Sequence, residues 1–169
     1  MSQLQIYFLR LLLFIFLQSF IFNQLEISAS IHVMITPLYL FLIPFDRSKF
    51  SLLLIALILG MAIDATSNTF GLHTSSLLLF AYLRPFIFRV FSPREGYDSL
   101  KIPSIFDMGN RWFISTFSIL LFSHHLWFFV LEAFSTSEIL LILQKTILSS
   151  VISFFVCIIL QTIFIKRTE

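Results

Sequence analysis

The side chains best suited to chemistry lie between residues 60 and 85, in the run GMAIDATSNTFGLHTSSLLLFAYLRP. Ala56, Gly60 and Asp64 are spaced by four residues, so they share one face of a helix. Small residues at this spacing allow another helix to approach closely, and the acid must then point into the protein. A carboxylate in apolar surroundings needs a proton, water or a cation. The segment therefore predicts a polar contact between helices.

The last apolar stretch offers a partner for this acid. Lys145 begins a row of polar or small residues that repeats every four positions through Ser149, Ser153, Cys157 and Gln161. With a rise of about 1.5 Å per residue, Asp64 and Lys145 fall at the same depth. We predict that Asp64 and Lys145 pair, or share a polar cluster, in the outer leaflet. The alternative is that Asp64 caps the end of its own helix beside Asn68, at the membrane interface.

The residues after Asp64 have the composition of a tight turn. Asn68 and Gly71 tolerate left-handed backbone, and the neighbouring hydroxyl residues can cap helix ends. The segment then runs to Tyr82 and Arg84, near the end of the next helix. We expect the positions of interest to be structural or partner-binding: Ala56, Gly60, Asp64, Asn68, Gly71, Tyr82, Arg84, Lys145, Ser149 and Ser153.

Histidines and enzyme motifs do not indicate a catalytic or metal site. The chain has four histidines, without the spacing of metal ligands. His73 follows the turn, and the adjacent His124 and His125 project in different directions along a helix. We expect these imidazoles at the outer interface, where an aromatic belt would comprise Trp127, Phe128 and Phe129. No nucleophile motif, carboxylate pair or phosphate-binding loop is present, so we predict no enzymatic activity and no cofactor.

The amino-acid composition indicates that these segments lie in a lipid membrane and not in water. Hydrophobic residues make up 58% of the 169 residues, only 12% are charged, and Phe occurs 23 times. The mean hydropathy is +0.96, and a soluble domain of this length could not bury so much apolar surface. The one cysteine, Cys157, excludes an intramolecular disulfide and indicates a small residue packed inside a helix.

We therefore expect a single all-α membrane domain over residues 1–169, a compact bundle of about six transmembrane helices. A span needs about 20 helical residues, and the second and third stretches are shorter than this. The expected spans are 4–22, 31–45, 50–64, 72–91, 112–131 and 139–165, with a cytoplasmic loop over 92–110. A cleaved signal peptide ending at Ser28–Ser30 is a less favoured alternative for the first stretch.

The basic residues predict the orientation. The loops at 23–30, 65–71 and 132–138 hold none, so the positive-inside rule places them outside and both termini in the cytoplasm. Arg84, Arg89, Arg94 and Arg111 gather on the cytoplasmic side, where we attribute them to topology; the alternative is binding of an anionic lipid or an acidic partner. The basic residues of the expected cytoplasmic segments are Arg10, Arg47, Lys49, Arg84, Arg89, Arg94, Lys101, Arg111, Lys166 and Arg167.

Several of these segments together resemble one family. GMAIDATSNTFGLHTSSLLLFAYLRPFIFR has a Gly, an acid, a Ser/Asn turn, a second Gly and then a Tyr and an Arg near the helix end. SPREGYD, HHLWFFVLEAF and the small-residue face of the last helix continue the pattern. At the start, FLQSFIF is followed by a polar turn and a Pro-bearing stretch that ends in LIPF. The chain resembles the rod shape-determining MreD family, in the form found in Bacteroidetes.

The resemblance implies a non-enzymatic component of the bacterial inner membrane. Such proteins bind the single-span scaffold MreC, and with it link MreB filaments to the glycosyltransferase RodA and its penicillin-binding transpeptidase. The implied fold is similar to the substrate-binding subunits of energy-coupling-factor transporters. That similarity supplies the rival function, a vitamin-capturing subunit with a polar pocket at Asp64, Asn68, His73 and Lys145. Against it, the first stretch, RLLLFIFLQSFIF, has none of the small docking residues of that family.

Overall fold

All regular secondary structure in the described part of the chain is helical. The structure is a computed structural model, and it describes residues 3–25, 31–98, 101–134 and 138–164. The long helices are α1 (Gln3–Phe20), α3 (Lys49–Ser67), α4 (Leu72–Val90), α6 (Asn110–Ala133) and α7 (Ile139–Phe164). The short ones are η1 (Phe22–Gln24), α2 (Thr36–Phe41) and α5 (Ile105–Met108).

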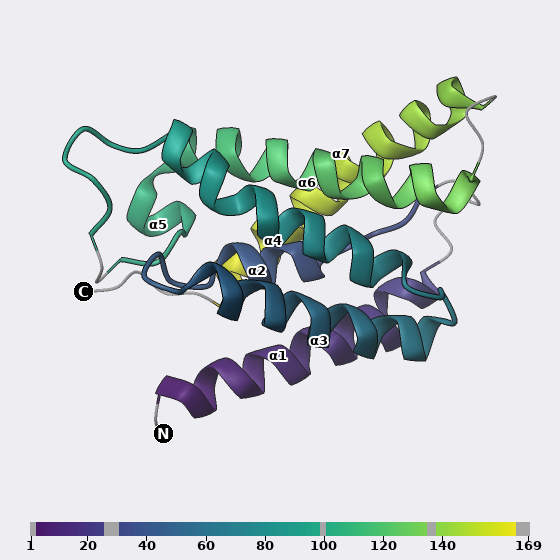
Figure 1. The fold of residues 1–169 in the computed structure, drawn as a ribbon, viewed down its shortest axis with the longest axis horizontal. Helices are drawn as coiled ribbons and strands as arrows, with labels where there is room; N and C mark the ends of the chain where they lie inside the picture. Colours follow the sequence, from purple (N-terminus) through teal and green to yellow (C-terminus); the bar gives the residue numbers. More distant parts are fainter. Residues whose placement is uncertain (1–2, 26–30, 99–100, 135–137, 165–169) are drawn as a thin grey trace.

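The long helices lie side by side, with the short α2 enclosed among them (Figure 1). Helix α3 packs between α1 and α4, α4 packs on α6, and α6 packs on α7. Helix α2 contacts α1, α3, α4 and α6, and all of its residues are buried. We call the end of the bundle where α3 begins and α4 ends the basic end, and the opposite end, with the α3–α4 turn, the far end.

Within the described residues, four helices are long and apolar enough to cross a membrane. These candidate spans are Gln5–Gln24, Lys49–Ser67, Asn110–Ala133 and Ile139–Phe164. They agree with the expectation of an all-α, multi-pass membrane protein. Helix α4 has 19 residues, as α3 does, but it is more polar, and it lies between α3 and α6.

The ends of α3 and α4 follow from local sequence. Ser48 caps α3, because its hydroxyl accepts a hydrogen bond from the backbone N–H of Ser51. At the far end Asn68 takes the left-handed conformation with φ 59°, and Gly71 precedes α4 with φ 94°. The sequence predicts this turn, but α3 continues to Ser67 rather than ending at Asp64.

The expected second helix over 31–45 is the element that the sequence predicts wrongly. Residues 31–35 form no helix, and only Thr36–Phe41 is helical. Residues 31–35 are called the extended segment below; its backbone is held by side chains of α1 and α7 instead of its own hydrogen bonds. The alternative signal-peptide site at Ser28–Ser30 lies outside the described residues.

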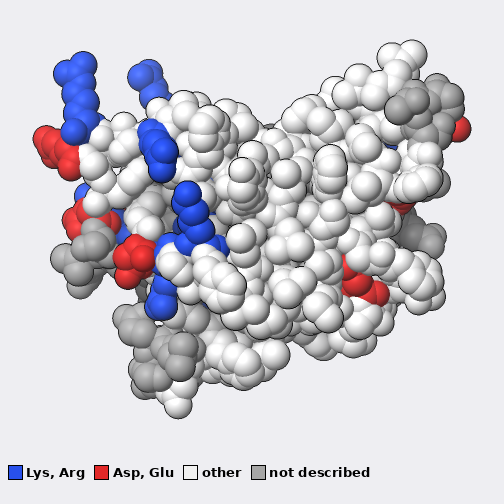
Figure 2. Space-filling model, viewed as in Figure 1, with Lys and Arg blue, Asp and Glu red and all other residues white. Residues whose placement is uncertain are grey.

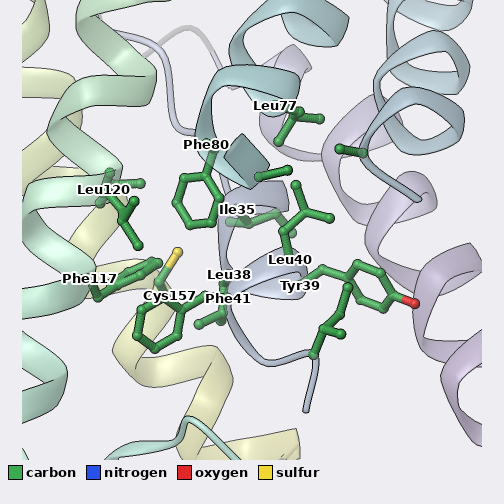
Figure 3. Close-up of a cluster of buried hydrophobic side chains, with 14 of the residues drawn as sticks. Ile35, Leu38, Tyr39, Leu40, Phe41, Leu77, Phe80, Phe117, Leu120 and Cys157 are labelled. Atoms are coloured by element: carbon green, nitrogen blue, oxygen red, sulfur yellow. The ribbon is translucent and has the colours of Figure 1, made fainter. Parts of the chain in front are cut away.

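The core is built around α2 (Figure 3). Leu38 and Phe41 of α2 are fully buried, together with Phe80 of α4 and Phe117 of α6. Cys157 of α7 closes this cluster; it is buried and unpaired, as the sequence indicates. The short helix is therefore part of the hydrophobic core, surrounded by the longer ones.

Candidate functional site

Asp64 binds the beginning of the following helix. Its Oδ1 accepts hydrogen bonds from Thr69 Oγ1 at 2.6 Å and from the His73 backbone N–H at 3.0 Å. Its Oδ2 accepts from the Thr74 backbone N–H at 2.9 Å and from Thr74 Oγ1 at 2.5 Å. The free N–H groups and the dipole at a helix start favour an anion there. Asp64 therefore caps α4 and ties it to α3.

The small-residue face of α3 lies directly against α4. A Cβ atom added to Gly60 would lie 2.4 Å from Thr74 Cα and 2.9 Å from Thr74 N, so only glycine fits at this crossing. Ala56, one turn earlier, is fully buried. The spacing of Ala56, Gly60 and Asp64 thus lets the helices come together and places the carboxylate beside the start of α4.

The predicted pair between Asp64 and Lys145 is wrong. Lys145 Nζ donates to Glu132 Oε2 at 3.3 Å, and no ion pair joins Lys145 to Asp64 in the described part of the chain. The reason is local: four donors of the α3–α4 turn already surround the Asp64 carboxylate, whereas Glu132 lies beside Lys145. The alternative of a helix cap is nearer to the structure, but the capped helix is α4 rather than α3.

The polar row on α7 holds the extended segment. Ser149 Oγ accepts a hydrogen bond from the His32 backbone N–H at 3.0 Å, and Ser153 Oγ accepts from the Met34 N–H at 2.9 Å. Two residues of extended chain advance about 6.6 Å, and four residues of helix advance about 6 Å. The repeat of four on α7 therefore matches every second N–H of the segment.

Gln18 of α1 completes this arrangement from the other side. Its Oε1 accepts from the Ile35 backbone N–H at 2.7 Å, and its Nε2 donates to the Val33 carbonyl at 2.9 Å. Non-helical backbone at membrane depth is stable only when the protein satisfies its polar groups. Sequence reasoning did not select Gln18, although an amide inside an apolar stretch was the available signal.

At the basic end, Arg84 binds backbone carbonyl groups at the end of α2. Its side chain is 3% exposed. Its Nε and Nη2 donate to the Phe41 carbonyl at 3.3 and 3.1 Å, and Nη2 also donates to the Ile43 carbonyl. Its guanidinium carbon lies 4.5 Å from the centre of the Phe88 ring. Free carbonyls at a helix C-terminus favour a cation, so Arg84 caps α2. Arg84 is thus a buried residue that fixes the end of α2, whereas Arg89, Arg94 and Arg111 are exposed.

The loop after α4 is fixed at the same end by aromatic side chains. Tyr97 Oη donates to the Phe88 carbonyl at 2.5 Å, and its ring stacks on Phe45 with centroids 4.3 Å apart. Trp112 Nε1 donates to the Phe91 carbonyl at 3.0 Å. Burial raises the pKa of Tyr97 above its ordinary value, which keeps the hydroxyl protonated as a donor.

The remaining predicted positions are dispersed. Asn68 is exposed at the far end, and Gly71 lies between α3 and α4. Tyr82 is 70% exposed on α4, so it does not join the contacts of Asp64. The structure thus brings Gly60 and Asp64 together with α4, and Ser149 and Ser153 together with the extended segment.

Three of the four histidines are not at the surface, whereas His32 is exposed. His73, His124 and His125 are buried, as are Phe128 and Phe129, so the predicted interfacial belt is wrong except for the exposed Trp127. The buried members lie on faces of α4 and α6 that pack against other helices. Among the described residues, no group of three or more metal-ligating side chains could hold a metal ion.

The two interior charges of the 60–85 segment therefore have matching roles. Asp64 accepts hydrogen bonds from the N–H groups at the start of α4, and Arg84 donates to the carbonyls at the end of α2. The arrangement stabilises helix ends. No family model, curated protein or solved structure matches the chain.

Proposed function

We propose that this protein is a non-enzymatic inner-membrane component of the bacterial cell-elongation machinery. In this role it binds MreC and helps to couple MreB filaments to peptidoglycan synthesis by RodA and its transpeptidase partner. The proposal depends on the resemblance to the MreD family, which covers nearly the whole chain and includes the stretch from residue 60 to residue 89. The observation that supports it most directly is the use of Asp64 and Arg84, the two buried charges within that stretch, to fix helix ends.

We further infer six membrane crossings. Helix α4 adds a fifth crossing to the four candidate spans. The extended segment together with α2, which lies between α1 and α3 in the chain, adds a sixth. Five extended residues and six helical residues advance together about 25 Å, close to the hydrocarbon thickness of about 30 Å. An arrangement similar to the substrate-binding subunits of energy-coupling-factor transporters is part of the same proposal.

The charge distribution supports an orientation with the basic end in the cytoplasm. Lysines and arginines gather at that end, and few appear elsewhere on the visible face (Figure 2). Labelling with a membrane-impermeant maleimide tests this, because the native Cys157 is buried. We expect Phe70→Cys, at the far end, to react in intact spheroplasts and Arg94→Cys to react only after lysis. The reverse pattern would contradict the orientation.

The rival function, vitamin capture, is weakened by the contacts of the residues it needs. The Asp64 carboxylate is surrounded by four donors, and Lys145 is paired with Glu132. A ligand at these groups would have to displace protein hydrogen bonds that hold α3 to α4. A scaffold has no such requirement, so the contacts favour the scaffold.

The decisive experiment is isolation of the tagged protein from its native membrane in mild detergent. We expect MreC to co-purify, with or without RodA and the transpeptidase. Recovery of a pair of ABC-type ATPases with a coupling subunit would instead establish the transporter function. A photo-crosslinking residue at Phe16, Met61 or Val151, which are exposed on α1, α3 and α7, would then locate the helix face that MreC covers.

A further inference from the structure

Two adjoining hollows lie between α3 and α4 at the basic end. One, of about 300 Å³, opens between the outer faces of the two helices. The other, of about 270 Å³, extends from it toward the loop that follows α4. They share the side chains of Lys49, Pro85 and Arg89. Together they form one depression, which we call the α3–α4 groove.

The inner part of the groove is strongly basic. Arg47, Lys49, Arg84 and Arg89 line it, with the polar residues Ser92 and Tyr97, and none of its described lining residues is acidic. Arg84 is nearly buried and uses Nε and Nη2 to cap α2; its Nη1 donates to no group in the described part of the chain. Four cations with no acidic residue among the described lining residues create a site for an anion.

The outer part of the groove is apolar. Leu53 lies one turn after Lys49 on α3, and Tyr82 and Phe86 lie up to two turns before Arg89 on α4. Tyr82 and Phe86 are highly exposed, although other faces of α4 pack against α3, α6 and α2. The groove is therefore amphipathic along its length, with cations at the basic end and apolar walls toward the middle of the bundle.

We propose that the α3–α4 groove binds an anionic phospholipid. The phosphate would lie among Arg47, Lys49 and Arg89, and an acyl chain would lie along Leu53 and Phe86. Basic pockets between membrane helices on the cytoplasmic side suit anionic lipid headgroups. The start of α3 at Lys49 adds the positive end of its dipole at the same place. A lipid is favoured over a free anion because the apolar part continues from the basic part.

The test compares binding of phosphatidylglycerol and phosphatidylcholine to the purified full-length protein by native mass spectrometry in detergent. We expect the anionic lipid to bind at least tenfold more tightly. In Lys49→Gln/Arg89→Gln this affinity should fall by about 30-fold, since each basic residue at a membrane surface contributes about a factor of five. The charge-conserving variant Lys49→Arg/Arg89→Lys should retain most of the binding.

The matched control is Arg94→Gln/Arg111→Gln, which removes the same charge from exposed positions at the same end but outside the groove. We expect it to lose less than threefold. An equal loss in both double variants would mean that the lipid responds to overall charge, and the groove proposal would be wrong. Competition by inorganic phosphate as strong as that by the lipid would also overturn it, because the apolar walls would then contribute nothing.

Discussion

Gly60→Ala tests the close contact between α3 and α4. The new Cβ would lie 2.4 Å from Thr74 Cα, whereas ordinary contact begins at 3.4 Å. Both neighbours are backbone atoms of α4, so no side-chain rotation relieves the overlap, and the helices must separate by about 1 Å. That movement stretches the 2.9 Å hydrogen bond from Thr74 N to Asp64 to a length at which it no longer forms.

The expected loss of stability has two sources. Overpacking a close contact costs about 1–3 kcal/mol, and a lost hydrogen bond to a charged group costs about 1.5–3 kcal/mol. The better helix propensity of alanine returns about 1 kcal/mol. The net change of about 2–5 kcal/mol should lower Tm by about 5–15 °C for a chain of this size. Thermal unfolding in detergent, followed by size-exclusion chromatography with fluorescence detection, measures it.

Two further variants make the result specific. Gly60→Ala/Thr74→Ser should melt no higher than Gly60→Ala, because trimming the Thr74 side chain leaves its backbone in place. Met61→Ala, on the exposed face of α3, should change Tm by less than about 2 °C. If Gly60→Ala itself melts within 2 °C of the unchanged protein, the close approach of α3 and α4 described above is incorrect.

Three other predictions use the same melting assay. Gln18→Leu should lower the free energy of unfolding by about 2–6 kcal/mol, because two buried backbone groups of the extended segment lose their partners. Gln18→Glu should lower it less, because it keeps an acceptor for the Ile35 N–H. Equal Tm values of the two variants would argue against the role of Gln18 in holding the extended segment. Asp64→Ala should destabilise the protein strongly, and the charge exchange Asp64→Lys/Lys145→Asp should not restore the yield of folded protein. Recovery of folded protein by the exchange would instead support a direct ion pair between Asp64 and Lys145. Arg84→Gln should lower Tm well below that of Arg89→Gln, since only Arg84 caps buried carbonyls, and similar Tm values would contradict its role.

Most of the long helices are predictable from the sequence because each is a long apolar run bounded by polar residues. The expected span 72–91 differs from α4 by one residue at its end, and 139–165 nearly coincides with α7. The turn at Asn68 and Gly71 is predictable for the same local reason, since few residues adopt a left-handed backbone without strain.

The contacts of the candidate site depend on distant residues, and the sequence indicates them poorly. The row from Lys145 to Gln161 indicates a buried polar face, but not that its serines bind backbone rather than Asp64. Arg84 has the same residue type as the exposed Arg89 and Arg94, and only the position of the α2 carbonyls explains its burial. Depth alone was insufficient to pair Asp64 with Lys145, because residues at one depth can face different neighbours.

The extended segment has a consequence for how the protein is made. The N–H groups of His32 and Met34 in this segment donate to Ser149 and Ser153, which lie 117 and 119 residues further along the chain, in α7. Until α7 is synthesised, those N–H groups have no protein acceptor and favour water over lipid. The extended segment is therefore expected to enter the bundle only after α7 has been synthesised. A ribosome that stops before α7 would leave a chain with residues 31–35 outside the membrane core, where quality-control proteases can reach them.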